Sequence, residues 1–131
     1  MKLDFLAPNA RYDLVHGKPA VVERDNDGSW LYRYNINPEM GVPEGEKDEV
    51  QIGWECCEIR LWEKPTKGKV KKAIIRSVLD ESAEFSLVNS YNKHVLKIKV
   101  DATAVDEYKE YLKFTEDVET MLQTDFSNET N

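Results

Sequence analysis

Residues Asp80–Tyr111 read DESAEFSLVNSYNKHVLKIKVDATAVDEYKEY, and this stretch carries the strongest fold signal in the chain. It contains two amphipathic helical patterns. Each pattern follows a group of capping residues, Asp80–Ser82 for the first and Asp101–Thr103 for the second. Asp106, three residues after Thr103, makes a variant capping box. We therefore expect two helices, whose apolar stripes are the largest apolar surface that this chain could bury.

Apolar residues on both sides of this stretch extend the helical pattern. Before it, Val70, Ile74 and Val78 follow helical spacing after a junction at residues 63–69. On the middle helix, one stripe holds Phe85, Val88, Asn92 and Val95, with Leu87, Tyr91 and His94 beside it. The last helix has a broad apolar face made of Val105, Tyr108, Tyr111, Leu112, Phe114, Val118, Met121 and Leu122. The pattern predicts about three helices within residues ~67–124.

The first half of the chain favours strands. Tyr12–His16, Ala20–Arg24 and Ser29–Ile36 are strand candidates, with a turn at Gly17 after the first. Asp25–Gly28 lies between the second and third candidates and ends in an Asp-Gly step. Such a step between strands predicts a hairpin with a type I′ turn, in which both central residues have positive φ.

Val50–Trp62 is the longest strand candidate, and its alternation of apolar residues changes phase at Cys56 and Cys57. One extra residue there would restore a continuous apolar face, so we predict a β-bulge at Cys56. Trp62 then lies on the outer face or at the strand end. The preceding residues 37–49 are rich in Pro, Gly and acidic residues and predict an exposed loop. Such loops are either functional or solvated insertions, and the composition favours the solvated type.

Strands followed by helices predict an α+β fold. We expect an antiparallel β-meander of three to four strands, residues ~11–62, followed by about three helices packed on one face. A chain of 131 residues has the length of one domain. We therefore predict a single domain, 1–131, with a β-rich half at 1–63, a helical half at 64–126 and a frayed tail at 127–131.

No apolar run approaches the ~20 residues that a membrane span needs. Met1–Leu6 carries an acid at position four and has no sustained apolar core, which is unlike a signal peptide. We expect a cytoplasmic protein with no membrane partner. Cys56 and Cys57 are the two cysteines, and adjacent residues of a strand point to opposite faces. We therefore expect reduced thiols rather than a vicinal disulfide.

Charge is distributed in three blocks. Residues 1–63 carry 7 Lys+Arg and 13 Asp+Glu, residues 64–100 carry 9 and 3, and residues 101–131 carry 2 and 9, which gives −6, +6 and −7. The basic residues at the first helix start are Lys64, Lys67, Lys69, Lys71, Lys72 and Arg76. Because positive charge opposes the dipole there, we expect compensation by the acidic last helix or by residues 44–49. The alternative is an acidic partner or nucleic acid, and nucleic acid is disfavoured because the cluster lacks interleaved aromatics.

Sequence motifs for metal binding or catalysis are weak in this chain. Glu23–Gly28 has acids at calcium-loop positions, but the twelfth position is Tyr34 instead of Glu, so the hairpin turn is preferred. His16 and His94 are the two histidines, and neither has a ligand or acid at a suitable spacing. We expect no catalytic residue, no metal and no cofactor. A deep pocket holding either histidine beside carboxylates would favour an enzyme instead.

Exposed aromatic side chains are the candidates for binding a protein partner. Trp30, Tyr32 and Tyr34 share one face of the expected strand, and such a stripe is either a ligand platform or a packed sheet face. The partner-binding candidates are Trp30, Tyr32, Trp54 and Trp62, with residues 37–49 as an additional element.

Three segments within residues 70–112 carry a resemblance: Val70–Arg76 with its Ile-Ile-Arg, Asp80–Asn92 with its acidic and aliphatic residues, and Asp106–Tyr111 with its Glu-Tyr repeats. They resemble helical segments near the C-termini of phage tail-fibre assembly and baseplate-associated proteins. The whole chain resembles small uncharacterised proteins of gut Bacteroides-type bacteria and their prophages. The resemblance implies a non-enzymatic protein–protein interaction module, an accessory in phage or prophage assembly and then virion-associated, and it implies no site residue.

Two alternatives stay open. The charge of −7 and the acidic last helix are typical of an acidic regulatory or inhibitor protein that binds a basic surface of a host protein. The third hypothesis is an enzyme of unrecognised type. Strong salt dependence of partner binding would favour the inhibitor, because an interface anchored by aromatic residues is screened less.

Overall fold

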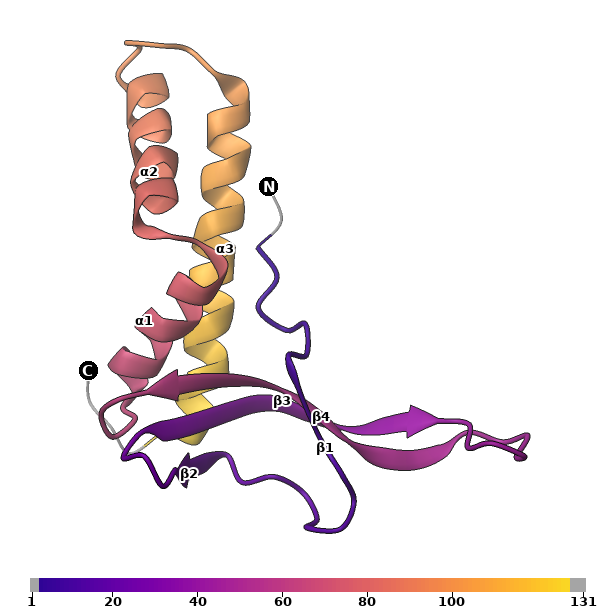
Figure 1. The fold of residues 1–131 in the computed structure, drawn as a ribbon. Helices are drawn as coiled ribbons and strands as arrows, with labels where there is room; N and C mark the ends of the chain where they lie inside the picture. Colours follow the sequence, from indigo (N-terminus) through magenta and orange to yellow (C-terminus); the bar gives the residue numbers. More distant parts are fainter. Residues whose placement is uncertain (1–2, 128–131) are drawn as a thin grey trace. The chain divides into compact units, whose positions relative to one another are not determined.

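The computed structural model describes residues 3–127 and confirms the α+β fold (Figure 1). Four strands precede three helices along the chain. The elements are β1 (Ala10–Tyr12), β2 (Val22–Arg24), β3 (Trp30–Gly41), β4 (Val50–Leu61), α1 (Lys67–Val78), α2 (Glu81–Val95) and α3 (Ala102–Asp125). The strands form one antiparallel sheet in the order β1-β4-β3-β2. Consecutive strands β2, β3 and β4 make the expected meander, and β1 joins its β4 edge.

The chain divides into two compact units. The sheet unit is Leu6–Pro65, and the helical unit combines the residues up to Phe5 with those from Thr66 onward. This boundary lies close to the one expected at residues 63 and 64. The single domain and the packing of the helices on one face stay predictions. Of the expected frayed tail, residues 128–131 lie outside the described residues.

The hairpin between β2 and β3 is confirmed, but its turn is of another type. The amide of Gly28 donates to the carbonyl of Asp25 at 3.1 Å, and the amide of Asp25 donates to the carbonyl of Ser29 at 2.9 Å. Gly28 has φ +89°, whereas Asp27 does not have a positive φ. This is a type I turn followed by a left-handed glycine, as in three-residue hairpin loops. The prediction of a type I′ turn was wrong because the loop is one residue longer than that turn requires.

The first strand and the loop at residues 37–49 differ from expectation. β1 is Ala10–Tyr12 instead of Tyr12–His16, and Gly17, with φ +73°, closes the turn that follows. β3 continues through Pro38 to Gly41, which leaves residues 42–49 as the connection to β4. The proline is tolerated because β2 pairs with β3 only at residues 30–32, so β3 has a free edge beyond them.

A β-bulge lies opposite Cys56, but the extra residue belongs to β3. Tyr34 pairs with Cys57, and Asn37 pairs with Glu55, so two residues of β3 face Cys56 alone. Asn35 has φ +52° in this bulge, a conformation that asparagine tolerates better than most residues. The phase change in the β4 pattern therefore indicated the correct position and the wrong strand. Sequence periodicity in one strand cannot show which of two paired strands carries the extra residue.

All three helices begin at a side-chain cap. Thr66, Asp80 and Asp101 accept hydrogen bonds from amides of the first helical turns of α1, α2 and α3. The start signals at Asp80 and Asp101 are thus confirmed, with Asp101 rather than Thr103 as the cap. No helix among the described residues is long and apolar enough to cross a membrane.

The core of the helical unit is partly as expected. Its buried apolar residues are Val70, Ile74, Ile75, Leu79, Leu87, Ala104, Phe114, Val118, Leu122 and Phe126. On α2, Leu87 is buried, whereas Phe85 and Val95 are exposed. The expected α2 stripe of Phe85 and Val88 is therefore shifted toward Leu87. The rings of Tyr91 and Tyr108 stack with their centroids 4.3 Å apart and join α2 to α3.

Gly53 of β4 lies against the backbone of β1. A Cβ at this position would lie 2.5 Å from the carbonyl oxygen of Tyr12, which is backbone and cannot rotate away. We expect Gly53→Ala to lower the free energy of unfolding of the sheet unit by about 1–3 kcal/mol through overpacking. All three tryptophans belong to this unit, so tryptophan fluorescence in a urea titration measures it.

Gly41→Ala is the matched control. A Cβ there would meet the end of the Ile52 side chain at 2.7 Å, and that side chain is half-exposed and can rotate. We expect a change within about 1 kcal/mol for the control. Equal midpoints for the two variants would show that the β1 backbone does not restrain Gly53.

Candidate functional site

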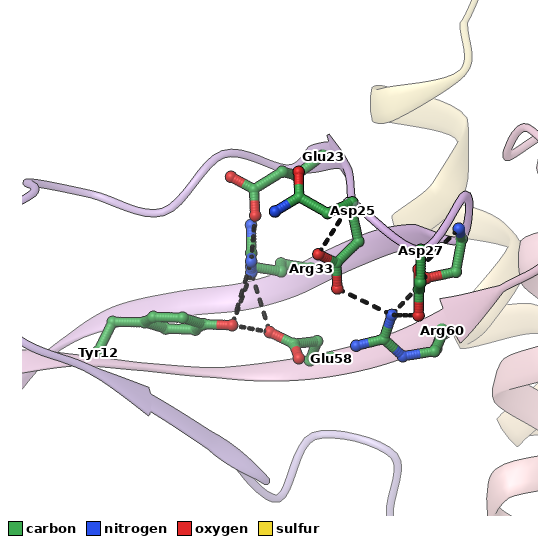
Figure 2. A network of polar contacts seen from close by, with 9 residues as sticks. Tyr12, Glu23, Asp25, Asp27, Arg33, Glu58 and Arg60 are labelled. Carbon is green, nitrogen blue, oxygen red and sulfur yellow. Dashed lines mark hydrogen bonds and ion pairs between the residues drawn. The ribbon is translucent and has the colours of Figure 1, made fainter.

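One arginine joins all four strands of the sheet (Figure 2). The Arg33 guanidinium of β3 contacts Glu58 of β4 through Nε at 3.0 Å and Glu23 of β2 through Nη2 at 3.0 Å. It also donates to the Tyr12 hydroxyl of β1 through Nη2 at 3.1 Å and to the carbonyl of Ala20 through Nη1 at 3.0 Å. The Tyr12 hydroxyl donates in turn to the Glu58 carboxylate. We call these four side chains the Arg33 cluster.

Burial and hydrogen bonding have opposite effects on the pKa of Arg33 in this cluster. The Arg33 side chain is 3% exposed. Burial alone would lower its pKa, but hydrogen bonds to Glu23, Tyr12 and Glu58 raise the pKa above its ordinary value. Burial, and then the hydrogen bond to Glu58, raise the pKa of Tyr12. Arg33 therefore stays charged, and its donors are directed at groups of its own unit, which is typical of a structural arginine.

A hollow of about 590 Å³ lies beside the cluster. Its lining includes Tyr12 and Arg33, and also His16, Asp13 and Glu23. This is the arrangement of a histidine beside carboxylates that would favour an enzyme. However, His16 forms no hydrogen bond with either acid within residues 3–127. The hollow therefore offers exposed polar groups but no oriented acid–base pair.

The acids of the candidate calcium loop face a cation of the chain itself. Arg60 Nη1 lies 3.0 Å from Asp25 Oδ2 and 3.5 Å from Asp27 Oδ2 (Figure 2). Hydrogen bonds from the Ser29 side chain and amide lower the pKa of Asp27. The carboxylates thus shape the β2–β3 turn and neutralise Arg60, so the hairpin interpretation is confirmed.

The remaining reactive residues have structural roles. His94 Nδ1 accepts a hydrogen bond from the Asp101 amide at 2.9 Å and joins the end of α2 to the start of α3. Cys56 and Cys57 are buried and are not joined by a disulfide, as expected for reduced thiols, and the Cys57 thiol donates to the Ala7 carbonyl at 3.3 Å. Burial raises the pKa of Cys56, which keeps it a thiol and a poor nucleophile.

The four aromatic candidates for partner binding differ in exposure. Tyr32 is fully buried and stacks on Tyr34 with the ring centroids 5.9 Å apart, so it offers no surface to a partner. Trp30 and Trp54 are half-buried, and the Arg24 guanidinium lies over the Trp30 ring at 5.4 Å. Trp62 is 69% exposed directly after β4. As binding residues, these positions stay predictions.

A second exposed apolar group lies at the far ends of β3 and β4, and the sequence reasoning missed it. Figure 1 shows these ends continuing beyond β1 as a two-stranded ribbon. We call residues 38–53 the arm. Its residues in β3 and β4 pair with each other, while β2 pairs with β3 at residues 30–32 and β1 pairs with β4 at residues 54–56. The exposed apolar residues of the arm are Met40, Val42, Val50 and Ile52.

The signal for the arm was present in the sequence. Met40 and Val42 alternate with Gly41 before the acidic connection, and Val50 and Ile52 alternate after it. This is the period of a strand pair. The Pro and Gly residues nearby concealed it, because both are disfavoured in strands. The predicted loop thus contains the ends of a hairpin.

Two of the basic residues of α1, Lys67 and Lys71, are compensated by the acidic last helix, which is one of the two partners that the charge pattern predicted. Lys67 and Lys71 lie 2.5 Å and 3.0 Å from the Glu119 carboxylate of α3. Hydrogen bonds from the two lysines lower the pKa of Glu119. The acidic last helix is therefore partly occupied by contacts within its own unit.

A second polar cluster joins all three helices of this unit. The Glu84 carboxylate of α2 accepts a hydrogen bond from Arg76 of α1 at 2.7 Å and another from the hydroxyl of Tyr111 of α3. Burial disfavours the charged form of Glu84, but these two donors lower its pKa below the ordinary value. Burial and the Glu84 carboxylate raise the pKa of Tyr111 to about 12.

Comparisons of the chain with protein-family models, with curated proteins and with solved structures gave no match. The candidate sites therefore depend on geometry. Among the described residues, the Arg33 cluster and the Glu84 cluster stabilise their units, the hollow at His16 lacks oriented chemistry, and the arm presents unpaired apolar surface.

Replacing Arg33 tests its role as the structural centre of the sheet. We expect Arg33→Met to lower the free energy of unfolding by about 3 kcal/mol, because Glu58 would stay half-buried without its cationic partner. Arg11→Met is the matched control, since the Arg11–Glu39 ion pair is exposed and worth less than about 1 kcal/mol. Tryptophan fluorescence during urea unfolding measures both. Similar unfolding midpoints for the two variants would contradict the structural role.

Replacing Glu84 predicts a pH effect with a definite sign. Because folding lowers the Glu84 pKa, its contribution is present above the ordinary value of 4.5 and is lost as pH falls through the lowered pKa. At pH 7, Glu84→Gln should therefore cost about 1–2 kcal/mol. The difference from the wild type should shrink as the pH falls to about 3. Thermal unfolding followed by circular dichroism at 222 nm measures this.

Asp117→Asn serves as the control for Glu84. Asp117 forms an exposed ion pair with Lys113 one helical turn away, worth about 0.3–0.5 kcal/mol. We expect this variant to unfold close to the wild type. If the difference in stability between Glu84→Gln and the wild type is the same at neutral and at acid pH, the lowered pKa assigned to Glu84 is refuted.

Proposed function

We propose that this chain is a non-enzymatic protein–protein interaction module whose binding surface is the arm. The observation that carries the proposal is the exposure of Met40, Val42, Val50 and Ile52 on two strands that extend beyond the rest of the sheet. Gly41 pairs with Val50 and Met40 pairs with Gln51, so the exposed apolar side chains are divided between the two faces of this strand pair. Exposed apolar residues on a short segment are typical of binding surfaces. Strands with free edges also offer backbone groups to a partner.

The chemistry of the arm indicates what kind of partner it fits. Residues 42–49 contain four acids, Glu44, Glu46, Asp48 and Glu49, and one base, Lys47, for a net charge of −3. A complementary surface would combine apolar side chains with Lys or Arg. Nucleic acid does not fit this description, because its phosphates would repel the acids.

One of the aromatic candidates, Trp54, lies at the base of the arm. Trp54 pairs with Pro38 where the arm begins, and Trp62 lies at the other end of β4. Half-buried tryptophans beside an apolar surface are frequent anchors in interfaces. Trp54 is therefore a proposed contributor, whereas the buried Tyr32 and Trp62, which lies at the end of β4 away from the arm, are not part of this surface.

The setting of this interaction is proposed from the resemblance of residues 70–112 to phage tail-fibre assembly and baseplate-associated proteins. It supports an accessory role in phage or prophage assembly, in the bacterial cytoplasm or on the virion. The alternative of an acidic inhibitor rests on the charge of −7. Its last helix already uses Glu119 to bind Lys67 and Lys71, which weakens that alternative. The enzyme hypothesis rests on His16 in the hollow beside Arg33.

A comparison of arm variants tests the proposal. The tagged protein is incubated with a lysate of the natural host, with and without phage induction, and bound proteins are identified by mass spectrometry. We expect the double variant Val42→Ser, Val50→Ser to lose partners that the wild type retains, because it removes two exposed apolar side chains from the arm. Binding at about 0.5 M salt separates an apolar interface, which persists, from an acidic inhibitor, which dissociates.

Phe85→Ser is the matched control, because Phe85 is an exposed apolar residue on α2. It should retain every partner. Identical partners for the arm variant and the wild type would rule out the arm as the binding surface. Partners of the assembly type that appear only after induction support the assembly role.

A further inference from the structure

We propose that the arm binds a second copy of this chain, at the connection between α2 and α3. This inference rests on the proposed function of the arm and names its partner. We call residues 93–100, which read KHVLKIKV, the basic tip. The contact would join two different surfaces, the arm of one copy and the basic tip of the next.

The basic tip presents the most exposed group of apolar side chains in the helical unit as described. Leu96 is 68% exposed, and Ile98 and Val100 are each 72% exposed, with Val95 at 52%. No other element of the helical unit, in the part of it that the structure describes, covers them. Exposed aliphatic residues in this number cost solubility, and their usual purpose is binding.

Backbone hydrogen bonds hold the basic tip in shape. The amides of Ile98 and Lys99 both donate to the carbonyl of Lys93, at 2.9 Å and 3.3 Å. Lys97 adopts φ +61°, and the His94 ring accepts the Asp101 amide. The connection is therefore a defined turn, and its apolar side chains are already presented before any partner binds. Such preorganisation reduces the entropy lost on association.

The basic tip and the connection of the arm carry opposite net charges of equal size. Within residues 93–100 there are three lysines, Lys93, Lys97 and Lys99, and no acid, for a net charge of +3 with His94 neutral. The connection of the arm, residues 42–49, has a net charge of −3. Each surface thus has exposed aliphatic side chains beside a net charge, and the two net charges have opposite signs.

An anionic membrane is the other surface that basic and apolar residues fit. The whole chain opposes it, because a net charge of −7 is repelled by anionic lipid. A membrane would also leave the arm without a partner. A second copy of the chain offers a basic tip to the arm and an arm to the basic tip, so the observations favour it.

A contact between two different surfaces determines how further copies can associate. Because the two surfaces are different, a single contact leaves the tip of one copy and the arm of the other free. Association then either ends in a two-fold dimer through a reciprocal second contact or proceeds to rings or open chains. The mass in solution should rise with protein concentration and fall with added salt.

Two variants and their mixture test this inference by sedimentation velocity. The tip variant is Leu96→Ser, Ile98→Ser, and the arm variant is Val42→Ser, Val50→Ser. Each side chain is exposed, so both proteins should keep the wild-type circular dichroism spectrum. We expect the wild type to associate at protein concentrations of about 10–500 µM in low salt. Each variant alone should associate about tenfold or more weakly, because one of its two surfaces is damaged.

The mixture is the decisive sample. The intact arm of the tip variant can bind the intact tip of the arm variant, so an equimolar mixture should form a heterodimer and nothing larger. Phe85→Ser should associate like the wild type. A wild type that stays monomeric at all concentrations, or a mixture that stays monomeric, would overturn the inference. So would binding of the wild type, but not of the tip variant, to vesicles that contain phosphatidylserine.

The outcomes separate this inference from the proposed function. If the wild type is monomeric while the arm variant loses its partners from the host lysate, the arm is a binding surface for another protein and the second copy is excluded. If the arm variant keeps all partners and all self-association, both proposals fail.

Discussion

The sheet depends on the buried Arg33 guanidinium. β1 and β2 are each three residues long, and strands of this length bring few backbone hydrogen bonds to a sheet. Arg33 compensates for this by binding one side chain from each of the other strands: Tyr12, Glu23 and Glu58. A buried charge is costly unless it is paired, so the cluster favours one arrangement of four strands over partly paired alternatives. The strand order β1-β4-β3-β2 places all three of these side chains within reach of Arg33.

A polar cluster also joins the elements of the helical unit. Glu84 receives donors from Arg76 and Tyr111, and so one carboxylate joins three helices. The stacked rings of Tyr91 and Tyr108 and the buried aliphatic residues of α1 and α3 supply the apolar part of the packing. In each unit, a polar cluster defines the register of elements and apolar contacts supply most of the stabilisation.

In each unit, one exposed apolar surface lies away from the polar cluster. The arm extends beyond the pairing of β1 and β2, and the basic tip lies at the connection between α2 and α3. Neither surface contributes to the core of its unit, and the structure of each is maintained by local hydrogen bonds. A surface that is ordered, apolar and not needed for folding is available for binding. This separation of stability from exposed apolar surface supports an interaction module and a contact between copies.

The sequence by itself determined the α+β fold, the two helix starts at Asp80 and Asp101, the β2–β3 hairpin and the internal compensation of the α1 lysines. These features depend on periodicity, capping and charge, which are local properties of the chain. Tertiary structure alone decided which strand carries the bulge, that β3 runs past Pro38, and that Arg33 is buried with three partners. Those partners are distant in sequence, and an alternating pattern describes Arg33 as one more outward polar residue. Long-range pairing, in which each strand depends on its neighbours, cannot be read from any single segment.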